Sequence, residues 1–539
     1  MGLIGQRSRP ADGPAPLIDR DRSAVARFVR AGRWESPVGF VVGLAVLVGG
    51  ALATASAMIA VVTDGRDAGS FALAGLLWAA LGGAFVRQCR IPLRLRSTSA
   101  FVGVFAAWSA FIAVSTATYF LADTFAVLDD ALFESVSGFT TTASTVVVDP
   151  ESLSRATLFW RAGTQWVGGL GALLFVVVFL PSIGVGGLDV TEAGQRHAGT
   201  SLRSRRTLLQ LRRLTTLYAT LTVAGIALYL LGGMGPFDAV TYAATTISTG
   251  GFANHAGSFG HFESTTVEWA GIGGMILGGA NLALMFRATR PGGVRTLVRS
   301  FELRAYLTVV FGGGVAVVAL TQSTDELTHE SIRRSFFHVA SAASTTGHFV
   351  DGWSAWEVGG QVLLLAIIGV GAMSGSAGGG FRLVRALTLV GYLRRELVLQ
   401  VHPRAVTPVR VGRRTVSDAL VSRMIGYQAQ YLVVAAVGAV VVAALGVDLV
   451  TAISGAISAI ANMGPALGDL VPGAGGVLDL PRPARAALMP LMLLGRLEIA
   501  PVLVGAALAG SSVARRVGDV RFRVGELRSD TRGAGDGRR

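Results

Sequence analysis

Four short stretches of the chain are rich in threonine, serine and glycine, and each lies between two long apolar runs. These stretches are Phe133–Val146, Phe237–Phe252, Ser335–Phe349 and Asp448–Leu467. In each, an apolar half-helix pattern leads into small or hydroxyl-bearing residues before the apolar sequence resumes. Irregular backbone at membrane depth is tolerated where it is buried in protein or lines a water-filled cavity. Carbonyl oxygens in such a place can coordinate a monovalent cation.

The polar loops recur at roughly even intervals, with Ala143, Gly250, Gly347 and Gly464 at corresponding places. Four loops around one axis would form a ring of carbonyl oxygens, called the filter below, that replaces the hydration shell of an ion. Glycine suits this ring because inward carbonyls need backbone angles that a Cβ disfavours. The alternative is that the small residues only pack helices closely. The predicted ion-binding residues are Thr141, Thr142, Ala143, Ser248, Thr249, Gly250, Thr345, Thr346, Gly347, Asn462, Met463 and Gly464.

The composition is that of a membrane protein. Of the 539 residues, 51% are hydrophobic and 15% are charged, and the apolar residues form runs long enough to span a bilayer. The basic residues are all arginine and give a net charge of +14. They gather in loops between apolar runs, which is typical of cytoplasmic anchors. Nucleic-acid binding, the other interpretation of a basic chain, is therefore disfavoured, and the single cysteine, Cys89, excludes an internal disulfide.

This pattern predicts an all-α polytopic membrane protein with four parallel helix–loop–helix repeats around a pseudo-fourfold pore. We expect ten spanning helices and four re-entrant segments that enter from outside. The return helices of the repeats are expected at 162–188, 269–286, 358–381 and about 486–514. The predicted units are a cytoplasmic segment at 1–36, an extra two-helix unit at 37–97, pore repeats at 98–213, 214–303, 304–423 and 424–514, and a basic cytoplasmic tail at 515–539.

Two features of the apolar helices indicate a gate. Gly371–Gly380 interrupts the third return helix, and its glycines disfavour helix formation. We predict an intramembrane loop beneath the filter there. An arginine inside an apolar helix, Arg496, is costly and usually faces a cavity or a partner. The hypothesis is that Arg496 meets the carbonyls of this loop; the predicted gate residues are Gly371, Ser374, Gly375, Ser376, Gly378, Gly379, Gly380 and Arg496.

Each gate feature has a simpler alternative. The glycines of the loop could form a close-packing helix face. The arginine could be a helix-end anchor that reaches the membrane surface.

The sequence contains no catalytic pattern. It has no Walker A motif, no GxGxxG that opens a helix after a strand, and neither HExxH nor CxxC. His338 and His348 are isolated in the sequence, and we favour an ordinary surface role for His348. We therefore expect a protein that is not an enzyme and holds no cofactor of its own, with any energy coupling or regulation supplied by a partner or by the ion gradient.

Several motifs together identify a family. They are SGFTTT at Ser137–Thr142, FWR and QWVGGLG within Phe159–Gly171, STGGF at Ser248–Phe252, STTG at Ser344–Gly347, SGSAGGG at Ser374–Gly380, RREL and VHP within Arg394–Pro403, NMGP at Asn462–Pro465 and GRLEI at Gly495–Ile499. They resemble the Trk/Ktr/HKT superfamily of potassium transporters, and specifically its bacterial TrkH type, over about Pro37–Ala514.

The resemblance implies more than the residues show. It implies K⁺ uptake through one pore per chain in the lipid bilayer of the bacterial inner membrane, with the N-terminus in the cytoplasm. It implies a homodimer that works with a cytoplasmic ring of nucleotide-binding regulatory subunits similar to TrkA. It also implies that Gly371–Gly380 and Arg496 form the gate, and that Ala143, Gly250, Gly347 and Gly464 occupy the filter positions.

The first loop departs from the family pattern, because Ala143 follows Thr142 where the family usually has glycine. In related plant transporters, serine at this position accompanies sodium conduction. The Cβ of Ala143 could turn one carbonyl away from the axis, so Na⁺ conduction, or K⁺ conduction with a Na⁺ leak, is the first alternative. An alternating-access solute carrier is a second, and it would be expected to have inverted repeats and a midplane substrate site.

Overall fold

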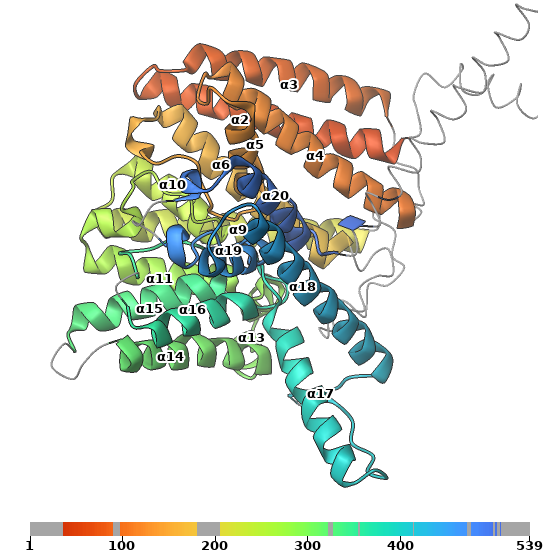
Figure 1. Cartoon of the computed structure of the whole chain (residues 1–539). Helices are drawn as coiled ribbons and strands as arrows, with labels where there is room; N and C mark the ends of the chain where they lie inside the picture. The colour runs from red at the N-terminus through yellow and green to blue at the C-terminus, as the bar shows by residue number, and fades with distance from the viewer. Residues whose placement is uncertain are drawn as a thin grey trace, which may run out of the picture.

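The structure is a computed structural model that describes residues 36–89, 97–179, 205–321, 327–353, 356–412, 414–471, 476–499, 502–503 and 507. It is almost entirely helical (Figure 1). The predicted segment at 1–36, apart from Ser36, and the tail at 515–539 lie outside the described residues, as do 180–204 and most of the predicted last helix beyond Arg496.

The chain opens with a helix pair, α2 (Pro37–Val62) and α3 (Ala68–Gln88). A Cβ on Gly82 of α3 would lie 2.8 Å from the Gly43 carbonyl oxygen of α2, so the two backbones approach closely. Glycine permits such approach between helices in a membrane. The turn between them joins the first repeat, where the Arg155 N–H donates to the Asp64 carboxylate at 3.2 Å.

Four repeats follow, each with an entering helix, a half-helix and a return helix. The entering helices are α4 (Ser97–Leu121), α9 (Arg205–Leu231), α14 (Phe301–Thr321) and α18 (Asp418–Ala444). The half-helices are α5 (Leu128–Phe139), α10 (Pro236–Ile247), α15 (His329–Ser344) and α19 (Leu449–Ala461). The return helices begin as α6 (Arg155–Leu174), α11 (Thr265–Gly279), α16 (Val358–Val370) and α20 (Arg482–Arg496).

Every return helix changes or ends part-way along its predicted length. α6 passes into a π-helix, η2 (Phe175–Phe179), and α11 meets α12 (Leu282–Ala288) at a bend of 103°. After α16 the chain resumes helical form as α17 (Leu383–Val401), and α20 ends at Arg496. The break that the sequence predicts in the third return helix at Gly371–Gly380 is present, whereas the changes in α6 and at the end of α11 were not predicted. The breaks at Gly278–Gly279 and after Gly371 fall where helix propensity is weakest.

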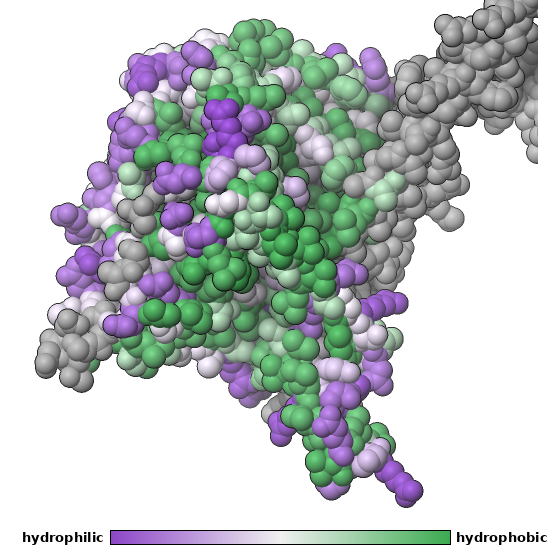
Figure 2. Space-filling model, viewed as in Figure 1, coloured by the Kyte–Doolittle hydropathy of each residue, from purple (hydrophilic) through white to green (hydrophobic). Residues whose placement is uncertain are grey.

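Within the described residues, six helices are long and apolar enough to cross a membrane, or up to seven if the bent pair is one span. The six are α2, α3 and the four entering helices. Hydrophobic residues cover the broad middle of the face in Figure 2, whereas hydrophilic residues gather at its left-hand edge and around the lower projection formed by α17. This distribution is that of a protein embedded in a bilayer.

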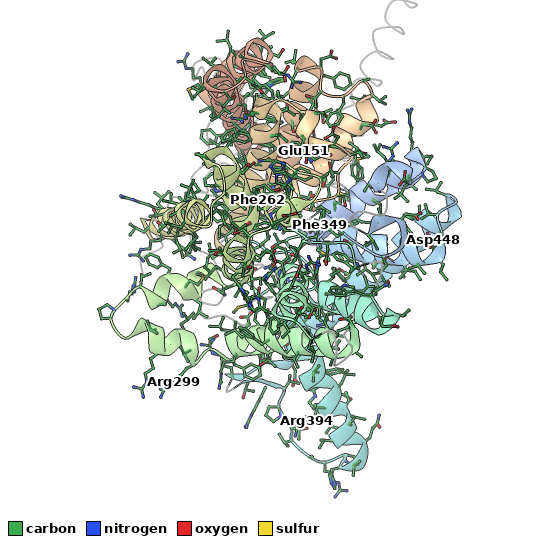
Figure 3. The ribbon with its side chains drawn as sticks, turned by 90° about the vertical axis from the view of Figure 1, so that its left-hand side faces the viewer. Glu151, Phe262, Arg299, Phe349, Arg394 and Asp448 are labelled. Atoms are coloured by element: carbon green, nitrogen blue, oxygen red, sulfur yellow. The ribbon has the colours of Figure 1, made fainter. Side chains whose placement is uncertain are left out.

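The short elements connect the helices. They are α13 (Gly293–Val298), β1 (Arg410–Val411) paired antiparallel with β2 (Arg414–Thr415), and the 3₁₀ turns η1 (Pro150–Ser152), η4 (Ser258–Phe262), η6 (Gly468–Leu470) and η7 (Val477–Asp479). One hydrophobic cluster joins repeats 1 and 4, and another joins repeats 2 and 3. Figure 3 shows the four repeats, in brown, olive, green and blue, in successive quarters around a common centre.

Candidate functional site

Each half-helix ends in the same hydrogen-bonded turn. At the end of α5, the Thr141 N–H donates to the Gly138 carbonyl at 3.1 Å and the Thr142 N–H to the Ser137 carbonyl at 2.9 Å. These are the two bonds of a Schellman motif, and equivalent pairs close α10, α15 and α19. The left-handed residues of the four turns are Thr141, Thr249, Thr345 and Asn462, with φ of 55°, 55°, 57° and 56°.

Two residues later the backbone again has positive φ in all four loops. The residues are Ala143, Gly251, Gly347 and Gly464, with φ of 66°, 79°, 89° and 93°. The predicted equivalence of Gly250 with Ala143 was therefore wrong by one residue. Gly250 has the place of Thr142, and Gly251 has the place of Ala143. The two glycines in sequence hid this register, which the end of α10 at Ile247 determines.

The four loops meet in a ring through backbone contacts that leave no room for side chains. A Cβ on Gly251 would lie 2.1 Å from the Thr346 carbonyl oxygen of repeat 3. A Cβ on Gly347 would lie 2.2 Å from the Met463 oxygen of repeat 4, and one on Gly464 would lie 2.2 Å from the Thr142 oxygen of repeat 1. Each glycine thus lies against the next repeat around the ring, and repeats 1 and 3 are opposite.

The junction between repeats 1 and 2 is built differently. Ala143 carries a methyl group where the other loops have glycine, and ideal Cβ positions on Gly251 and Gly347 would each lie 2.8 Å from it. Since Gly347 belongs to the opposite repeat, the methyl group points towards the centre of the ring. On the neighbouring loop, the Gly250 carbonyl accepts a 2.7 Å hydrogen bond from Gln165 Nε2.

Several polar side chains of the ring region are already hydrogen-bonded, although Thr141 Oγ1 and Asn462 Oδ1 have no partner among the described residues. The hydroxyl groups of Thr142 and Thr346 lie 2.7 and 2.6 Å from those of Thr140 and Ser344. Asn462 Nδ2 donates to Thr142 Oγ1 at 3.1 Å and joins repeat 4 to repeat 1. The predicted filter residues are therefore brought together, apart from the shift at Gly250, and the backbone carbonyls are the oxygens best placed to bind an ion.

A buried ion pair, which sequence reasoning missed, supports the first loop from outside. Arg161 Nε lies 2.8 Å from Glu134 Oε1, with side chains 2% and 0% exposed. Glu134 also accepts from the Thr145 hydroxyl at 2.9 Å, and Arg161 donates to Thr145 Oγ1 at 3.0 Å and to the Ala253 carbonyl at 3.2 Å. The Glu134–Arg161 pair with these hydrogen bonds, called the brace below, holds the loops of repeats 1 and 2 together. Its signal in the sequence is a glutamate and an arginine within apolar stretches, where charges are costly.

His348 is not a surface residue, and the favoured interpretation was wrong. Its side chain is fully buried, with Nε2 3.1 Å from the Thr245 hydroxyl and Nδ1 3.3 Å from the Ser258 hydroxyl. The ring stacks on Tyr242 at a centroid distance of 5.6 Å. His348 therefore links the loop after filter residue Gly347 to repeat 2.

Acidic residues occupy the outer ends of half-helices. Asp448 caps α19 and accepts hydrogen bonds from the N–H groups of Val450 and Thr451 at 2.9 and 3.1 Å. Hydrogen bonds from Thr451 and then Val450 hold the pKa of the Asp448 carboxyl below its usual value. Asp130, at the start of α5, pairs with Arg485 of α20 at 2.7 Å. These negative charges stabilise the N-terminal ends of the half-helices, which carry a partial positive charge. The C-terminal ends, which carry a partial negative charge, face the ring.

The segment Gly371–Gly380 is a buried loop that lies against the inner side of the ring. The Gly379 N–H donates to the Thr345 hydroxyl at 2.8 Å. The Met373 and Ala377 N–H groups donate to the carbonyls of Gly279 and Gly278, at the break of α11, at 3.1 and 3.2 Å. All seven predicted gate residues in the loop are buried. The loop thus touches filter residues and the broken return helix of repeat 2.

Arg496 does not make the predicted contact with this loop. It is buried, 3% exposed, but its Nε and Nη2 have no hydrogen-bond acceptor among the described residues. It is the last residue of α20, and the chain turns at Glu498 with φ of 65°. Glu498 instead pairs with Arg385 at 2.7 Å and Arg382 at 3.5 Å. Three buried arginines against one buried glutamate leave this inner cluster positively charged.

Known proteins share this architecture. Residues 70–514 match the TrkH family, described as cation transport proteins. The Trk system potassium uptake protein TrkH of Halomonas elongata is 35% identical over 379 residues, covering 70% of this chain and 78% of the relative. TrkI of the same organism is 32% identical over 454 residues, covering 83% and 91%.

A solved structure agrees with these relatives. The crystal structure of the potassium transporter TrkH from Vibrio parahaemolyticus matches with a TM-score of 0.79 at 29% identity, and the match covers 87% of this chain and 98% of that one. The resemblance and the all-α polytopic fold predicted from the sequence are confirmed.

The brace makes a prediction about stability. Replacing Glu134 with Gln leaves Arg161 charged and buried without its counter-ion, and breaking a buried pair in this way costs about 3–5 kcal/mol. We expect a lower thermal unfolding temperature of the purified protein in detergent. The control is Glu330→Gln, which breaks the exposed pair with Arg334 and should cost less than about 1 kcal/mol. If the two changes lower the unfolding temperature equally, the Glu134–Arg161 pair does not have the proposed stabilising role.

The ring makes a second prediction. Gly464→Ala places a methyl group against the Thr142 carbonyl oxygen and should force the loops of repeats 4 and 1 apart. Overpacking of this kind costs about 1–3 kcal/mol, so the unfolding temperature should fall. Gly171→Ala on α6, where a Cβ meets nothing within 4 Å, is the matched control. A tolerated Gly464→Ala would mean that the ring is looser than described.

Proposed function

This chain belongs to the TrkH family of cation transport proteins and takes up potassium, and from that premise we propose that the ion passes through the ring formed by the four loop ends. The observation that carries the proposal is the identical Schellman turn, followed by a second residue of positive φ, in all four repeats. Each turn satisfies the N–H groups of the first two residues of its loop. The carbonyl oxygens are thereby left to replace the hydration shell of K⁺.

The half-helices add a favourable field for the ion. The C-terminal end of a helix carries a partial negative charge, and α5, α10, α15 and α19 all end at the ring. Four such ends stabilise a cation on the axis. The proposed activity is transport alone, with no chemical step and no resident cofactor.

We propose that Ala143 weakens selection of K⁺ over Na⁺. Its methyl group points towards the centre of the ring and breaks the equivalence of the four loops. A smaller or more easily distorted site then favours the smaller ion. The same fold conducting Na⁺ is the alternative, and this one position distinguishes it from K⁺-selective uptake.

The gate is proposed to consist of the Gly371–Gly380 loop and the inner arginine cluster. The loop blocks the axis beneath the ring by its backbone. Arg496 and Arg382 add positive charge on the same side, which repels an approaching cation. In this proposal Arg496 acts through its charge. This action does not depend on the predicted hydrogen bonds between Arg496 and the loop carbonyls.

The surroundings of the pore are also proposed from the family. The arginines that follow α12, including Arg290, Arg295 and Arg299, support a cytoplasmic position for that end of the repeats and for the N-terminus. We propose a bacterial inner-membrane location, a homodimer and a nucleotide-binding regulatory subunit similar to TrkA.

The first functional test is cation uptake by purified protein in proteoliposomes, with K⁺, Rb⁺ and Na⁺ compared. Ala143→Gly should raise the K⁺/Na⁺ flux ratio about tenfold if restoring the fourth equivalent loop adds about 1.4 kcal/mol of discrimination. Ala253→Gly, which lies outside the ring, is the control. An unchanged ratio in Ala143→Gly would refute the proposed role of the methyl group.

The proposed gate is tested with Arg496 variants that remove or keep the positive charge. Arg496→Gln should raise the K⁺ flux of correctly folded protein several-fold, because it removes one of the buried positive charges. Arg496→Lys keeps the charge and should stay near the original flux. The control is Arg482→Ala, at the exposed outer end of the same helix. If Gln and Lys variants behave alike, the barrier is not electrostatic.

A further inference from the structure

Three side chains of the types that can bind a metal ion converge away from the ring: Glu151, His255 and His261. Glu151 belongs to η1, which follows loop 1, whereas His255 and His261 lie on the segment that follows loop 2. One ligand atom from each of the three lies within 4.8 Å of the others. In Figure 3, Glu151 and the neighbouring Phe262 lie close to the centre.

The distances fit a transition metal. Glu151 Oε1 lies 3.4 Å from His255 Nδ1, and two ligands of a tetrahedral zinc ion with bonds of about 2.0–2.1 Å are about 3.3 Å apart. The His255 and His261 rings lie parallel with centroids 3.6 Å apart, so one ring must rotate about its side-chain bonds before both nitrogens can direct their in-plane lone pairs at one ion. Two imidazoles and one carboxylate form a donor set that zinc prefers over the oxygen-only sets of calcium and magnesium.

A second carboxylate lies beside the far nitrogen of His255. His255 Nε2 lies 3.4 Å from Asp238 Oδ1, and Asp238 in turn accepts a 2.7 Å hydrogen bond from Asn254. A carboxylate on the far nitrogen is the usual partner of a metal-binding histidine. Both His255 nitrogens are shielded from solvent and form no hydrogen bond with described residues.

The Glu151 carboxylate is held by a backbone hydrogen bond. The Ala256 N–H donates to Glu151 Oε1 at 3.0 Å. This bond and the 3.4 Å contact with His255 Nδ1 place the Glu151 carboxylate beside the histidines.

We propose that Glu151, His255 and His261 bind one zinc ion at the outer mouth, with Asp238 as a positioning residue for His255. The ion would connect the loop that follows filter segment 1 to the loop that follows filter segment 2. The same two loops are joined beneath it by Arg161, through Thr145 and the Ala253 carbonyl. Zinc therefore clamps the mouth at the junction where Ala143 interrupts the ring.

The test measures binding itself and so does not depend on transport. Full-length, tag-free protein is dialysed against buffered Zn²⁺, and bound metal is counted. We expect one ion per chain, and His255→Ala and His261→Ala should each weaken binding at least about tenfold. Asp238→Asn should weaken it about 10- to 100-fold, the range for loss of a positioning carboxylate. Binding of Co²⁺ should give the visible absorption of a low-coordinate nitrogen–oxygen site.

The controls separate a site from general affinity. His329→Ala removes another histidine that begins a half-helix, α15, and should leave zinc binding unchanged. Glu151→Gln keeps the size of the side chain and guards against misfolding as the cause of a loss. The proposal is overturned if no zinc binds, if binding survives both His255→Ala and His261→Ala, or if His329→Ala weakens it equally.

Discussion

The close contact between a ring glycine and a carbonyl oxygen of the next repeat is the constraint to which the rest of the structure is fitted. At Gly251, Gly347 and Gly464 an added Cβ would lie 2.1–2.2 Å from that oxygen. No side chain can enter such a junction, so each half-helix must end at one definite depth. The Schellman turns set that depth and also satisfy the N–H groups of the first two residues of each loop, which find no water in a bilayer. The carbonyl oxygens of Thr142, Thr346 and Met463 accept no hydrogen bond among the described residues and remain available for an ion, whereas that of Gly250 accepts one from Gln165.

Charged side chains also connect each of several repeats to the next one around the ring, as the backbone contacts do. Arg161, on the return helix of repeat 1, donates to loop 2 at the Ala253 carbonyl. Glu268, on the return helix of repeat 2, pairs with Arg333 on the half-helix of repeat 3 at 2.6 Å. Arg485, on the return helix of repeat 4, pairs with Asp130 on the half-helix of repeat 1. A buried pair is not a strong source of stability in itself. Its use here is to fix the neighbour's position, which the backbone contacts require.

Much of this site could be predicted from the sequence, because the four stretches share a pattern that local residues determine. Ala143, Gly347 and Gly464 have equivalent backbone conformations, as the pattern indicates, since each of these loops has one residue that fits it. Gly250 and Gly251 could not be distinguished, because the register depends on where α10 ends in three dimensions. The Glu134–Arg161 brace joins residues 27 positions apart, and no periodicity relates them. Arg496 was found from its charge alone, but its surroundings depend on how α17 and α20 pack.

The ring and the loop beneath it cannot move independently. Gly379 N–H is bound to the Thr345 hydroxyl, and a Cβ on Gly379 would lie 2.4 Å from the Ala461 carbonyl oxygen at the end of α19. Asn281 and Leu282, just after the break in repeat 2, donate to the carbonyls of Ser374 and Gly375.

With the bonds to Gly278 and Gly279 and the bond from the Ser374 N–H to Glu302 Oε1, at least six hydrogen bonds hold the loop. At about 1 kcal/mol each, releasing six bonds costs about 6 kcal/mol. A ligand that displaces the loop must therefore bind the displaced state more tightly than the observed one by at least this much. Because Thr345 is the left-handed residue of its turn, displacement of the loop also removes a bond from the filter itself. Displacement of the loop and the conformation of the ring are therefore two parts of one equilibrium.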